Sequence, residues 1–462
     1  MEKFRVEKDS LGKVKVPAEA LYGAQTQRAI DNFPISGIGF NRSFIGSLGL
    51  IKAIAAQING QLGLIPKQIA AVVNKAALEV NEGKWDDEFP VDIYQTGSGT
   101  STNMNANEVI ANRAQTLLNK KSKLKIHPND HVNFGQSSND VIPTVIRIAA
   151  YVSCQYSLLP ALKTLQAALV DKGSEYADVV KTGRTHLMDA MPLTVEQAFS
   201  GYARQAELGA ERVAGVLERL RELPLGGTAV GTGINTHPRF ASLFAKMLSK
   251  ETGLPFKEAT NHFEAQGTVD APVELSGALK SVAVSVLKIV NDLRWMNSGP
   301  NAGLGELQLA ALQPGSSIMP GKVNPVIEES TAMVCAQVIG NDTAINLGGI
   351  AGSFELNTML PLVGHNLLES IRLLSNAIFN LADKSVTKIT FCREHVAEAV
   401  NKNPILVTAL NPIIGYEKAA QIAKKAFKEN RSVKDVVLEN TDLSSKQLDK
   451  LLDPRNMTKG GL

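Results

Sequence analysis

Three long stretches of the chain share one apolar pattern, and this pattern limits the possible folds more than any other feature of the sequence. Apolar residues recur in alternating steps of four and three residues through positions 145–159, 199–223 and 275–296. The average spacing of about 3.5 residues is the period of helices that pack side by side at a shallow angle. The sequence therefore predicts a mainly α-helical protein built around a bundle of long helices.

Such helices, about 25 to 30 residues long, would reach roughly 40 Å at about 1.5 Å per residue. They far exceed the mean globular helix. Several rods of that length leave extended apolar flanks. Other copies of the chain could cover these flanks, or one chain could close the bundle by itself. We favour oligomerisation, because it covers the flanks most economically.

The sequence on either side of the bundle predicts two further domains. Residues 1–138 form an N-terminal domain that begins with short strands or extended arms and continues into helices. Residues 139–390 form the central long-helix bundle, and 391–462 form a small C-terminal domain whose short helices are broken by Asn-Pro pairs. Helical runs outside the three patterned stretches cover 43–59, 67–80, 105–118, 327–347 and 362–381.

Three prolines bear on the long helices. Pro143 and Pro192 lie near the expected starts of two of them, where proline fits the first turn. Pro160 falls inside the first apolar pattern. We expect it to kink that helix, because a proline inside a helix removes a backbone hydrogen bond.

Composition argues against several classes of function. The 48 lysines and arginines nearly balance 45 aspartates and glutamates, so the net charge of +3 gives no electrostatic case for binding nucleic acid or a membrane surface. The chain has no run of about 18 apolar residues that would predict a membrane span, and its start lacks the apolar region of a signal peptide. Three widely spaced cysteines fit a reducing compartment. We expect a soluble, cytoplasmic protein.

One polar stretch, 315–325, reads Gly-Ser-Ser-Ile-Met-Pro-Gly-Lys-Val-Asn-Pro. Ser316 and Ser317 are adjacent, and Lys322 and Asn324 follow closely. Alone, this composition is also that of an ordinary surface turn. Three further polar stretches lie far away in the sequence, at the ends of apolar helical runs. Their presence favours an active site assembled from distant segments.

The other stretches supply candidate anion ligands and a candidate acid–base group. Positions 95–103 and 136–140 precede expected helices, where backbone N–H groups and free hydroxyls can hold an anion. Positions 183–190 precede the helix expected at Pro192 and contain His186. An imidazole titrates near neutral pH, which suits a general acid–base; a purely structural histidine is the alternative.

Two motifs point less clearly to a ligand. His127 and His131 are four residues apart with Asn129 and Asp130 between them, but they lack the helical context of a metal-binding pair. The glycine-rich stretch 226–233 predicts a tight turn with close backbone approach. It lacks the strand and helix of a dinucleotide-binding fingerprint. We therefore expect no metal ion and no organic cofactor.

The polar groups as a set suit a small polyanion. Hydroxyls, amides and backbone N–H groups can each hold a carboxylate oxygen, and Lys322 supplies the positive charge that a developing dianion needs. A nucleophile elbow of the Ser–His–Asp type is absent from the sequence. Removal of a proton next to a carboxylate fits best, with a hydroxyl deprotonated by its surroundings as the base.

These motifs resemble those of a known family. Residues 315–325 are similar to the central motif of the fumarase/aspartase superfamily, and the resemblance to class II fumarases covers essentially the whole chain. The stretches that resemble class II fumarases rather than aspartases are 23–28, 95–100, 127–130, 226–233 and 354–357.

The resemblance implies a three-domain fold whose long central helices form a twenty-helix core in a homotetramer. It implies reversible hydration of fumarate to (S)-malate, a step of the citric acid cycle, without a metal ion or organic cofactor. Three subunits would contribute to each active site. The nearest alternative is an aspartate ammonia-lyase of the same superfamily, and a non-catalytic scaffold with the same fold is a third possibility.

The resemblance also assigns roles to residues. Ser316 resembles the base that removes the C3 proton of malate, on a loop that closes over the substrate. Lys322 and Asn324 resemble the groups that bind the substrate carboxylate and stabilise an aci-carboxylate intermediate. His186 would contact the substrate or a water molecule, paired with Glu329. Further substrate ligands would be Ser98, Thr100, Ser137, Ser138, Asn139 and Thr185. A secondary anion site would comprise His127, Asn129 and Asp130.

Overall fold

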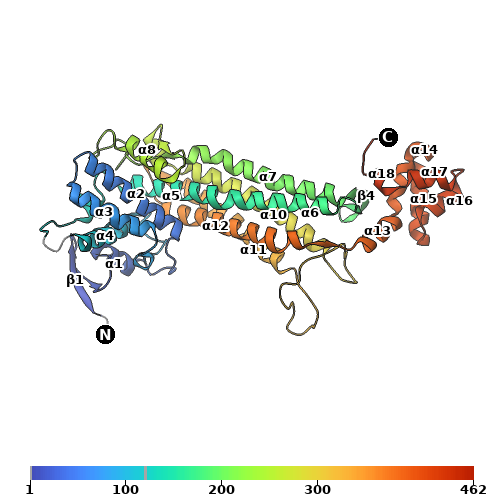
Figure 1. Cartoon of the computed structure of the whole chain (residues 1–462), viewed down its shortest axis with the longest axis horizontal. Helices are drawn as coiled ribbons and strands as arrows, with labels where there is room; N and C mark the ends of the chain where they lie inside the picture. The colour runs from blue at the N-terminus through green and yellow to red at the C-terminus, as the bar shows by residue number, and fades with distance from the viewer. Residues whose placement is uncertain (1–2, 119–121, 462) are drawn as a thin grey trace. The chain divides into compact units, whose positions relative to one another are not determined.

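The computed structural model describes residues 3–118 and 122–461 and is mainly α-helical (Figure 1). Backbone packing divides the chain into two compact units. The first comprises Met1–Pro160, Glu211–Ala283 and Ala336–Ser375, and the second comprises Ala161–Ala210, Val284–Cys335 and Asn376–Leu462. Because this division falls within the long helices, the three-domain organisation stays a prediction.

The N-terminal segment of the first unit forms an antiparallel hairpin, β1 (Phe4–Asp9) and β2 (Gly12–Pro17), followed by the helix α1 (Ala24–Asn32). The hairpin agrees with the short strands expected here. The helix was not expected, because the first helical run predicted from the sequence begins at residue 43. Gly23 precedes α1 without a side-chain cap, so the usual sequence mark of a helix start is missing.

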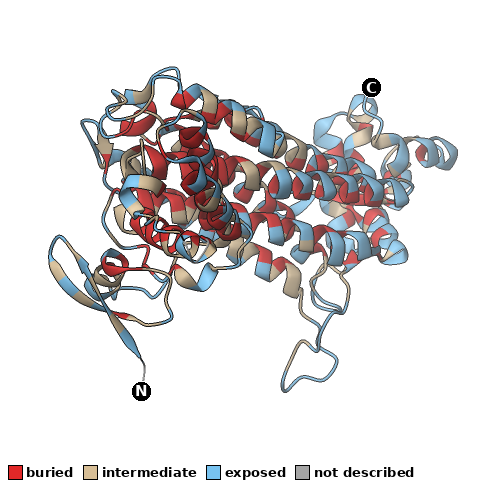
Figure 2. Cartoon of the chain, turned by 60° about the vertical axis from the view of Figure 1, so that its left-hand side comes forward, coloured by how far each residue is buried: buried red, intermediate tan, exposed pale blue. Residues whose placement is uncertain are grey.

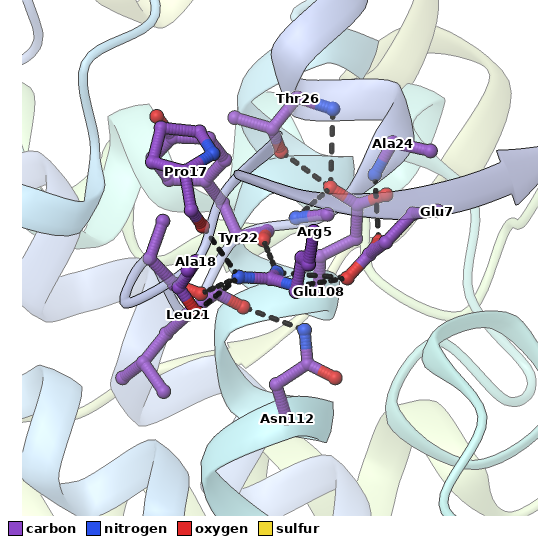
Figure 3. Close-up of polar contacts among 12 residues, drawn as sticks. Arg5, Glu7, Pro17, Ala18, Leu21, Tyr22, Ala24, Thr26, Glu108 and Asn112 are labelled. Atoms are coloured by element: carbon purple, nitrogen blue, oxygen red, sulfur yellow. Dashed lines mark hydrogen bonds and ion pairs between the residues drawn. The ribbon is translucent and has the colours of Figure 1, made fainter. Parts of the chain in front are cut away.

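Glu108, on α4 (Thr100–Leu117), supplies the missing cap (Figure 3). Its buried carboxylate accepts hydrogen bonds of 2.6 to 3.0 Å from the start of α1, namely from the backbone N–H groups of Gly23, Gln25 and Thr26 and from the Thr26 hydroxyl. The Arg5 guanidinium holds the preceding loop by donating to the carbonyl groups of Pro17, Ala18, Ala20 and Tyr22. A negative charge also favours a helix N-terminus electrostatically.

The next helical runs are confirmed. They form α2 (Arg42–Gln61) and α3 (Lys67–Asn81), which pack against each other, and then α4. Because α4 begins at Thr100, the polar stretch 95–103 includes the first turn of this helix. Shorter elements of the first unit are η1 (Asp86–Glu88), η2 (Pro128–Val132), β5 (Glu222–Leu223), α8 (Phe240–Thr252), β6 (Lys257–Glu258), α9 (His262–Gly267), β8 (Gly352–Ser353) and β9 (Leu356–Asn357). Strand β5 pairs with β6, and β8 pairs with β9.

The predicted long helices are present. They are α5 (Ser138–Ser153), which continues through η3 (Cys154–Leu158) into α6 (Leu159–Glu175), then α7 (Val195–Leu220), α10 (Asp270–Met296), α11 (Val326–Ile350) and α12 (Leu360–Lys384). The apolar seams predicted for α7 and α10 are buried along both helices. Figure 2 shows buried and exposed residues alternating along the long helices of the chain. The last seam residue, Leu223, is also buried but lies in β5, because α7 ends at Leu220.

The seam predicted for the first long helix is correct only at its start. Val145 is buried, whereas Tyr156 is 59% exposed and the buried positions shift to Cys154 and Leu158. The cause is η3, a π-helical turn, whose wider winding rotates the face of the helix that follows. This turn ends just before Pro160. The kink predicted at Pro160 is therefore replaced by a local change of helical winding in the turn that precedes it.

The prediction that the other two prolines lie in the first turns of helices is wrong. Pro143 lies inside α5, beyond its first turn. Pro192 lies in strand β4 (Met188–Thr194), which pairs antiparallel with β3 (Val180–Thr185). A two-stranded sheet has edge positions where proline leaves no hydrogen bond unmade. The stretch 183–190 therefore forms a hairpin rather than a segment that leads directly into a helix.

One helical stretch, Ser138–Glu175, is long and apolar enough by length and composition to cross a membrane, although none was expected. In the structure, 61% of its apolar window is buried inside the protein. Burial of this kind is what a core helix of the bundle requires, and length and composition alone cannot distinguish the two cases.

The second unit ends in short helices, as predicted for the region after residue 390. Its apolar residues from Val407 to Leu448 form a core cluster around Leu410 and Val436. The remaining elements of this unit are β7 (Leu307–Gln308), which pairs with β10 (Thr390–Phe391), η4 (Val386–Lys388), α13 (Arg393–Lys402), η5 (Pro404–Leu410), α14 (Asn411–Ile414), α15 (Tyr416–Glu429), α16 (Val433–Asn440), α17 (Ser445–Leu451) and α18 (Pro454–Met457).

Candidate active site

Hydroxyl groups from two helix starts meet in the first unit. Ser98 Oγ lies 2.7 Å from Thr100 Oγ1, which in turn lies 2.7 Å from Ser138 Oγ. Gly99 permits this approach. It has a left-handed φ of 72°, and a Cβ atom added there would lie 2.9 Å from Ile142. The structure thus brings together the first and second predicted polar stretches, which we call the hydroxyl cluster (Ser98, Thr100 and Ser138).

The buried carboxylate of Asp140 fixes the start of α5 beside this cluster. Its Oδ1 accepts a hydrogen bond from the Ser137 backbone N–H at 2.9 Å, and its Oδ2 accepts two more at 2.9 Å from backbone N–H groups of the turn 226–233. Burial raises the pKa of Asp140, which these hydrogen bonds oppose. Asn139 Nδ2 donates to the carbonyl of Ala229 at 2.9 Å. The glycine-rich turn therefore approaches the helix start closely, as predicted.

Lys52, in α2, contacts the segment that leads into α5, and the sequence analysis missed it. Its side chain is completely buried, and its Nζ donates hydrogen bonds to Asn133 Oδ1 at 2.9 Å and to Gln136 Oε1 at 3.0 Å. Burial lowers the pKa of Lys52 to about 7, although the nearby Asp140 charge opposes this shift. The sequence does contain a signal for this residue, because Lys52 is a single lysine within an otherwise apolar helical run.

The residues predicted for a secondary anion site form the π-helical turn η2. His127 Nδ1 accepts hydrogen bonds from the backbone N–H groups of Asn129 and Asp130, both at 3.2 Å. The side chains of His127 and Asp130 are exposed. Across residues 3–118 and 122–461, no three His, Cys, Asp or Glu side chains gather as metal ligands would.

Thr185 and His186 lie at the tip of the β3–β4 hairpin in the second unit. His186 and Leu187 form its turn with φ values of 56° and 61°, a conformation that residues with side chains rarely adopt. Backbone strain of this kind concentrates at functional sites. Both side chains are exposed, so the hairpin presents the candidate acid–base group outward.

Glu306 holds the stem of this hairpin. Its buried carboxylate accepts a hydrogen bond from Arg184 Nη2 at 2.8 Å and lies 3.3 Å from Lys181 Nζ. Sequence reasoning missed this group, because 122 residues separate Glu306 from Arg184. A cavity of about 540 Å³ adjoins the hairpin, and its polar lining residues are Lys181, Arg184, His186, Tyr202, Lys288 and Asp292.

The central loop, 315–325, closes on itself through its own polar groups. Asn324 Nδ2 donates to the carbonyl of Gly315 at 2.6 Å, and Lys322 Nζ donates to Asn324 Oδ1 at 2.8 Å. A Cβ atom added at Gly315 would lie 2.1 Å from the Lys322 carbonyl oxygen, so only glycine fits there. The structure therefore places the candidate lysine and amide side by side.

Within this loop, Ser316 occupies a distinctive position. Its Oγ accepts hydrogen bonds from the backbone N–H groups of Met319 at 2.9 Å and Ile318 at 3.3 Å. Donors of this kind favour negative charge on the oxygen that accepts them. For the exposed Ser317, no side-chain hydrogen bond is found in the described part of the chain. The two adjacent serines thus differ in their surroundings.

Glu329 lies in the first turn of α11, where its backbone N–H donates to the carbonyl of Pro325 at 3.0 Å. Within one chain, considering the residues that the structure describes, it shares no hydrogen bond or ion pair with His186. The pairing of Glu329 with His186 therefore stays a prediction. The neighbouring Glu328 is buried and accepts a hydrogen bond from Ser385, and burial raises its pKa.

Comparison with known proteins supports the expected family. A family model described as a lyase matches residues 12–340, and a model described as the fumarase C C-terminus matches 406–459. The class II fumarate hydratase of Xylella fastidiosa (strain Temecula1) is 56% identical over 461 residues, which are 100% of this chain and 97% of that protein. Fumarate hydratase class II 2 of Pseudomonas aeruginosa is 53% identical over 462 residues, with 100% of both chains covered.

Solved structures agree over the same length. The class II fumarase from Schistosoma mansoni matches with a TM-score of 0.95 and 39% identity, covering 99% of each chain. A fumarate lyase:delta crystallin from Brucella melitensis, bound to cobalt, matches with a TM-score of 0.93 and 42% identity, covering 99% of this chain and 100% of that one. The long-helix fold and its polar clusters thus define an enzyme of the lyase class. Within that class, the chain belongs to the class II fumarate hydratase family.

Proposed function

We propose that this protein catalyses the reversible hydration of fumarate to (S)-malate. The observation that carries the proposal is full-length similarity, at 50 to 56% identity, to several proteins named class II fumarate hydratases. The polar groups support the same chemistry, since a fixed lysine, amides and clustered hydroxyls suit a small dicarboxylate. We further infer that the protein acts in the citric acid cycle and that it is located in the cytoplasm.

In the dehydration direction, Ser316 would act as the base. Its Oγ would take the proton from C3 of malate, and the C–H electron pair would pass into the adjacent carboxylate to give an aci-carboxylate. The hydroxyl on C2 would then take a proton from an acid in the site and leave as water, while the electron pair returns from the aci-carboxylate to form the C2–C3 double bond. Hydrogen bonds from the Met319 and Ile318 N–H groups support this role, because they favour a negatively charged Oγ.

Lys322 and Asn324 would bind the carboxylate that gains charge in this intermediate. Lys322 Nζ lies 2.8 Å from Asn324 Oδ1. This short distance supports a joint role, because one carboxylate can contact both side chains when they lie side by side. His186, paired with Glu329, would contact the leaving hydroxyl or a water molecule. The other ligands of the substrate would be Ser98, Thr100, Ser137, Ser138, Asn139 and Thr185.

We propose that the protein acts as a homotetramer in which three subunits contribute to each site. Large apolar side chains on the long helices support assembly, since Val284 on α10, Met333 and Leu347 on α11, and Phe379 on α12 are all more than half exposed in the single chain. Exposed apolar positions that recur along such helices mark an interaction surface. The described part of each chain has five long helices when α5 and α6 are taken as one, and four chains would supply the twenty of the expected core.

An absorbance assay separates this function from the alternative, aspartate ammonia-lyase. Fumarate absorbs strongly in the ultraviolet, whereas malate and aspartate absorb weakly. We expect absorbance to rise when the protein is given malate and to stay flat with aspartate. The names of the full-length relatives favour malate.

A further inference from the structure

Lys52 carries a charged group into the interior, and none of the described residues gives it a direct carboxylate partner. Its side chain has no exposed surface. Its Nζ donates to two amide oxygens, those of Asn133 and Gln136, at 2.9 and 3.0 Å. A buried ammonium group is costly unless its surroundings compensate for lost water. A lysine at this position therefore calls for a role that a neutral residue could not fill.

The two amides belong to a short segment that ends at the proposed substrate ligands. Asn133 Oδ1 also accepts a hydrogen bond from Asn103 on α4 at 3.2 Å, and Asn133 Nδ2 donates to the Gln136 carbonyl at 3.1 Å. Ser137 follows Gln136 directly and caps α5. Lys52 thus sits at the centre of polar contacts that tie α2, α4 and the start of α5 together.

The positive charge of Lys52 has a second effect, which acts on the buried carboxylate of Asp140. Asp140 lies in the first turn of α5, completely buried, and accepts three backbone hydrogen bonds. A negative charge so close to Ser138 and Asn139 opposes the binding of a doubly negative substrate there. Lys52 is the positive group whose field acts on Asp140, although the two share no direct ion pair among the described residues.

We propose that Lys52 is a positioning residue for this site: its buried ammonium group holds the segment before α5 and offsets the Asp140 carboxylate, so that the Ser137–Asn139 end of α5 accepts a dicarboxylate well only while Lys52 is charged. This inference rests on the proposed function, which makes Ser137, Ser138 and Asn139 substrate ligands.

The proposal predicts a pH dependence with a definite sign. The pKa of Lys52 is lowered to about 7, so the group is charged below this pH and neutral above it. Asp140 faces it from α5, while Asn103 from α4 and the amides of Asn133 and Gln136 are neutral. Burial lowers the pKa of His131 on η2, and the charges that act on this group are those of Asp130 and His127. Affinity for a dicarboxylate should therefore fall as pH rises through about 7.

Calorimetric titration with succinate, a dicarboxylate that cannot be dehydrated, tests this on the intact protein. Both succinate carboxyl groups are largely ionised between about pH 6.5 and about pH 8.5. Over this range we expect binding to weaken about twentyfold, because the fraction of the protein with a charged Lys52 falls. Lys52→Arg keeps its charge across this range, so it should bind with little pH dependence. Lys52→Met should bind weakly at both pH values.

Lys75→Met is the matched control, since Lys75 is an exposed lysine on the neighbouring helix α3; it should behave like the unmodified protein. Circular dichroism and sedimentation establish which variants fold, and if Lys52→Met does not, the unmodified protein and Lys52→Arg decide. Constant succinate affinity across the pH range would overturn the proposal, as would a Lys52→Arg protein that kept the full dependence, because another group would then be titrating. Failure to turn over malate at any pH would instead contradict the proposed function.

Discussion

The hydroxyl groups of Thr100 and Ser138 lie 2.7 Å apart, although 38 residues separate them along the chain. One opens α4 and the other opens α5. Two helix N-termini that meet in this way direct partial positive charge toward one place. This contact turns two unremarkable Ser- and Thr-rich stretches into a single site suited to a carboxylate.

Replacing Thr100 with valine tests that site, because valine keeps the shape and removes the hydroxyl. We expect the KM for malate to rise about tenfold or more, because the variant loses the binding free energy of about one hydrogen bond to a charged group. Steady-state kinetics measure the effect. Thr116→Val, at an exposed threonine on the same helix, is the control and should change little. An unchanged KM for Thr100→Val would remove Thr100 from the substrate ligands.

Ser316→Ala tests the proposed base. The variant should lose most turnover, at least about a hundredfold, because positioned proton transfer contributes about that much or more. Its assembly state should be unchanged, since the hydrogen bonds found for the Ser316 side chain among the described residues come from backbone groups of its own loop. Ser317→Ala, the neighbouring change, should retain far more activity. Near-full activity of Ser316→Ala would exclude it as the base.

Glu79 provides a prediction about acid stability. Arg113 donates two hydrogen bonds to its carboxylate at 2.6 and 3.0 Å, and Trp85 donates a third at 3.0 Å. These contacts lower the pKa of Glu79 to about 2 from 4.5, with Arg113 the larger cause. Because the folded-state pKa lies below the unfolded value, the stabilisation is present above about pH 4.5 and is lost as pH falls through about 2.

Glu79→Gln should therefore lower the free energy of unfolding near neutral pH by about 2 to 3 kcal/mol. The loss should shrink as the pH is lowered toward 2, which denaturant titrations at several pH values would reveal. Glu82→Gln, at an exposed glutamate on the same stretch of chain, should have little effect. Equal stability of the Glu79→Gln and unmodified proteins at neutral pH would contradict this account.

Assembly can be tested at the exposed faces of the long helices. Met333 on α11 is 68% exposed in one chain, and a lysine there would place a charge in the proposed tetramer core. We expect sedimentation to show a tetramer for the unmodified protein and smaller species for Met333→Lys, with activity lost in parallel. Phe427→Lys, at a 79% exposed site on α15, is the control. A stable, fully active monomer would defeat the shared-site model.

Features set by local pattern could be predicted from the sequence. The seams of α7 and α10 repeat over many turns, and every predicted position on them is buried. The polar stretches 95–103 and 136–140 were found because each lies at a helix start, and the stretch 226–233 because it is rich in glycine. In contrast, the β3–β4 hairpin was wrongly taken for a helix start, because its turn at His186 and Leu187 uses none of the usual turn residues.

Features set by distant partners could not be predicted. The cap of α1 comes from Glu108, more than eighty residues away, and the hairpin stem is held by Glu306. Lys52 gave little indication of its role, since a lysine in a helix is most often solvated. The π-helical turn before Pro160 moved the apolar face by a shift in winding that a fixed period does not describe.

The central claim, hydration of fumarate, is tested most directly by following ultraviolet absorbance after the purified protein is mixed with (S)-malate or, in parallel, with aspartate. Ser316→Ala prepared in the same way serves as the control for contaminating activity. We predict a rise in absorbance with malate, little or none with aspartate, and loss of the malate signal in Ser316→Ala. A rise with aspartate but not with malate would contradict the account.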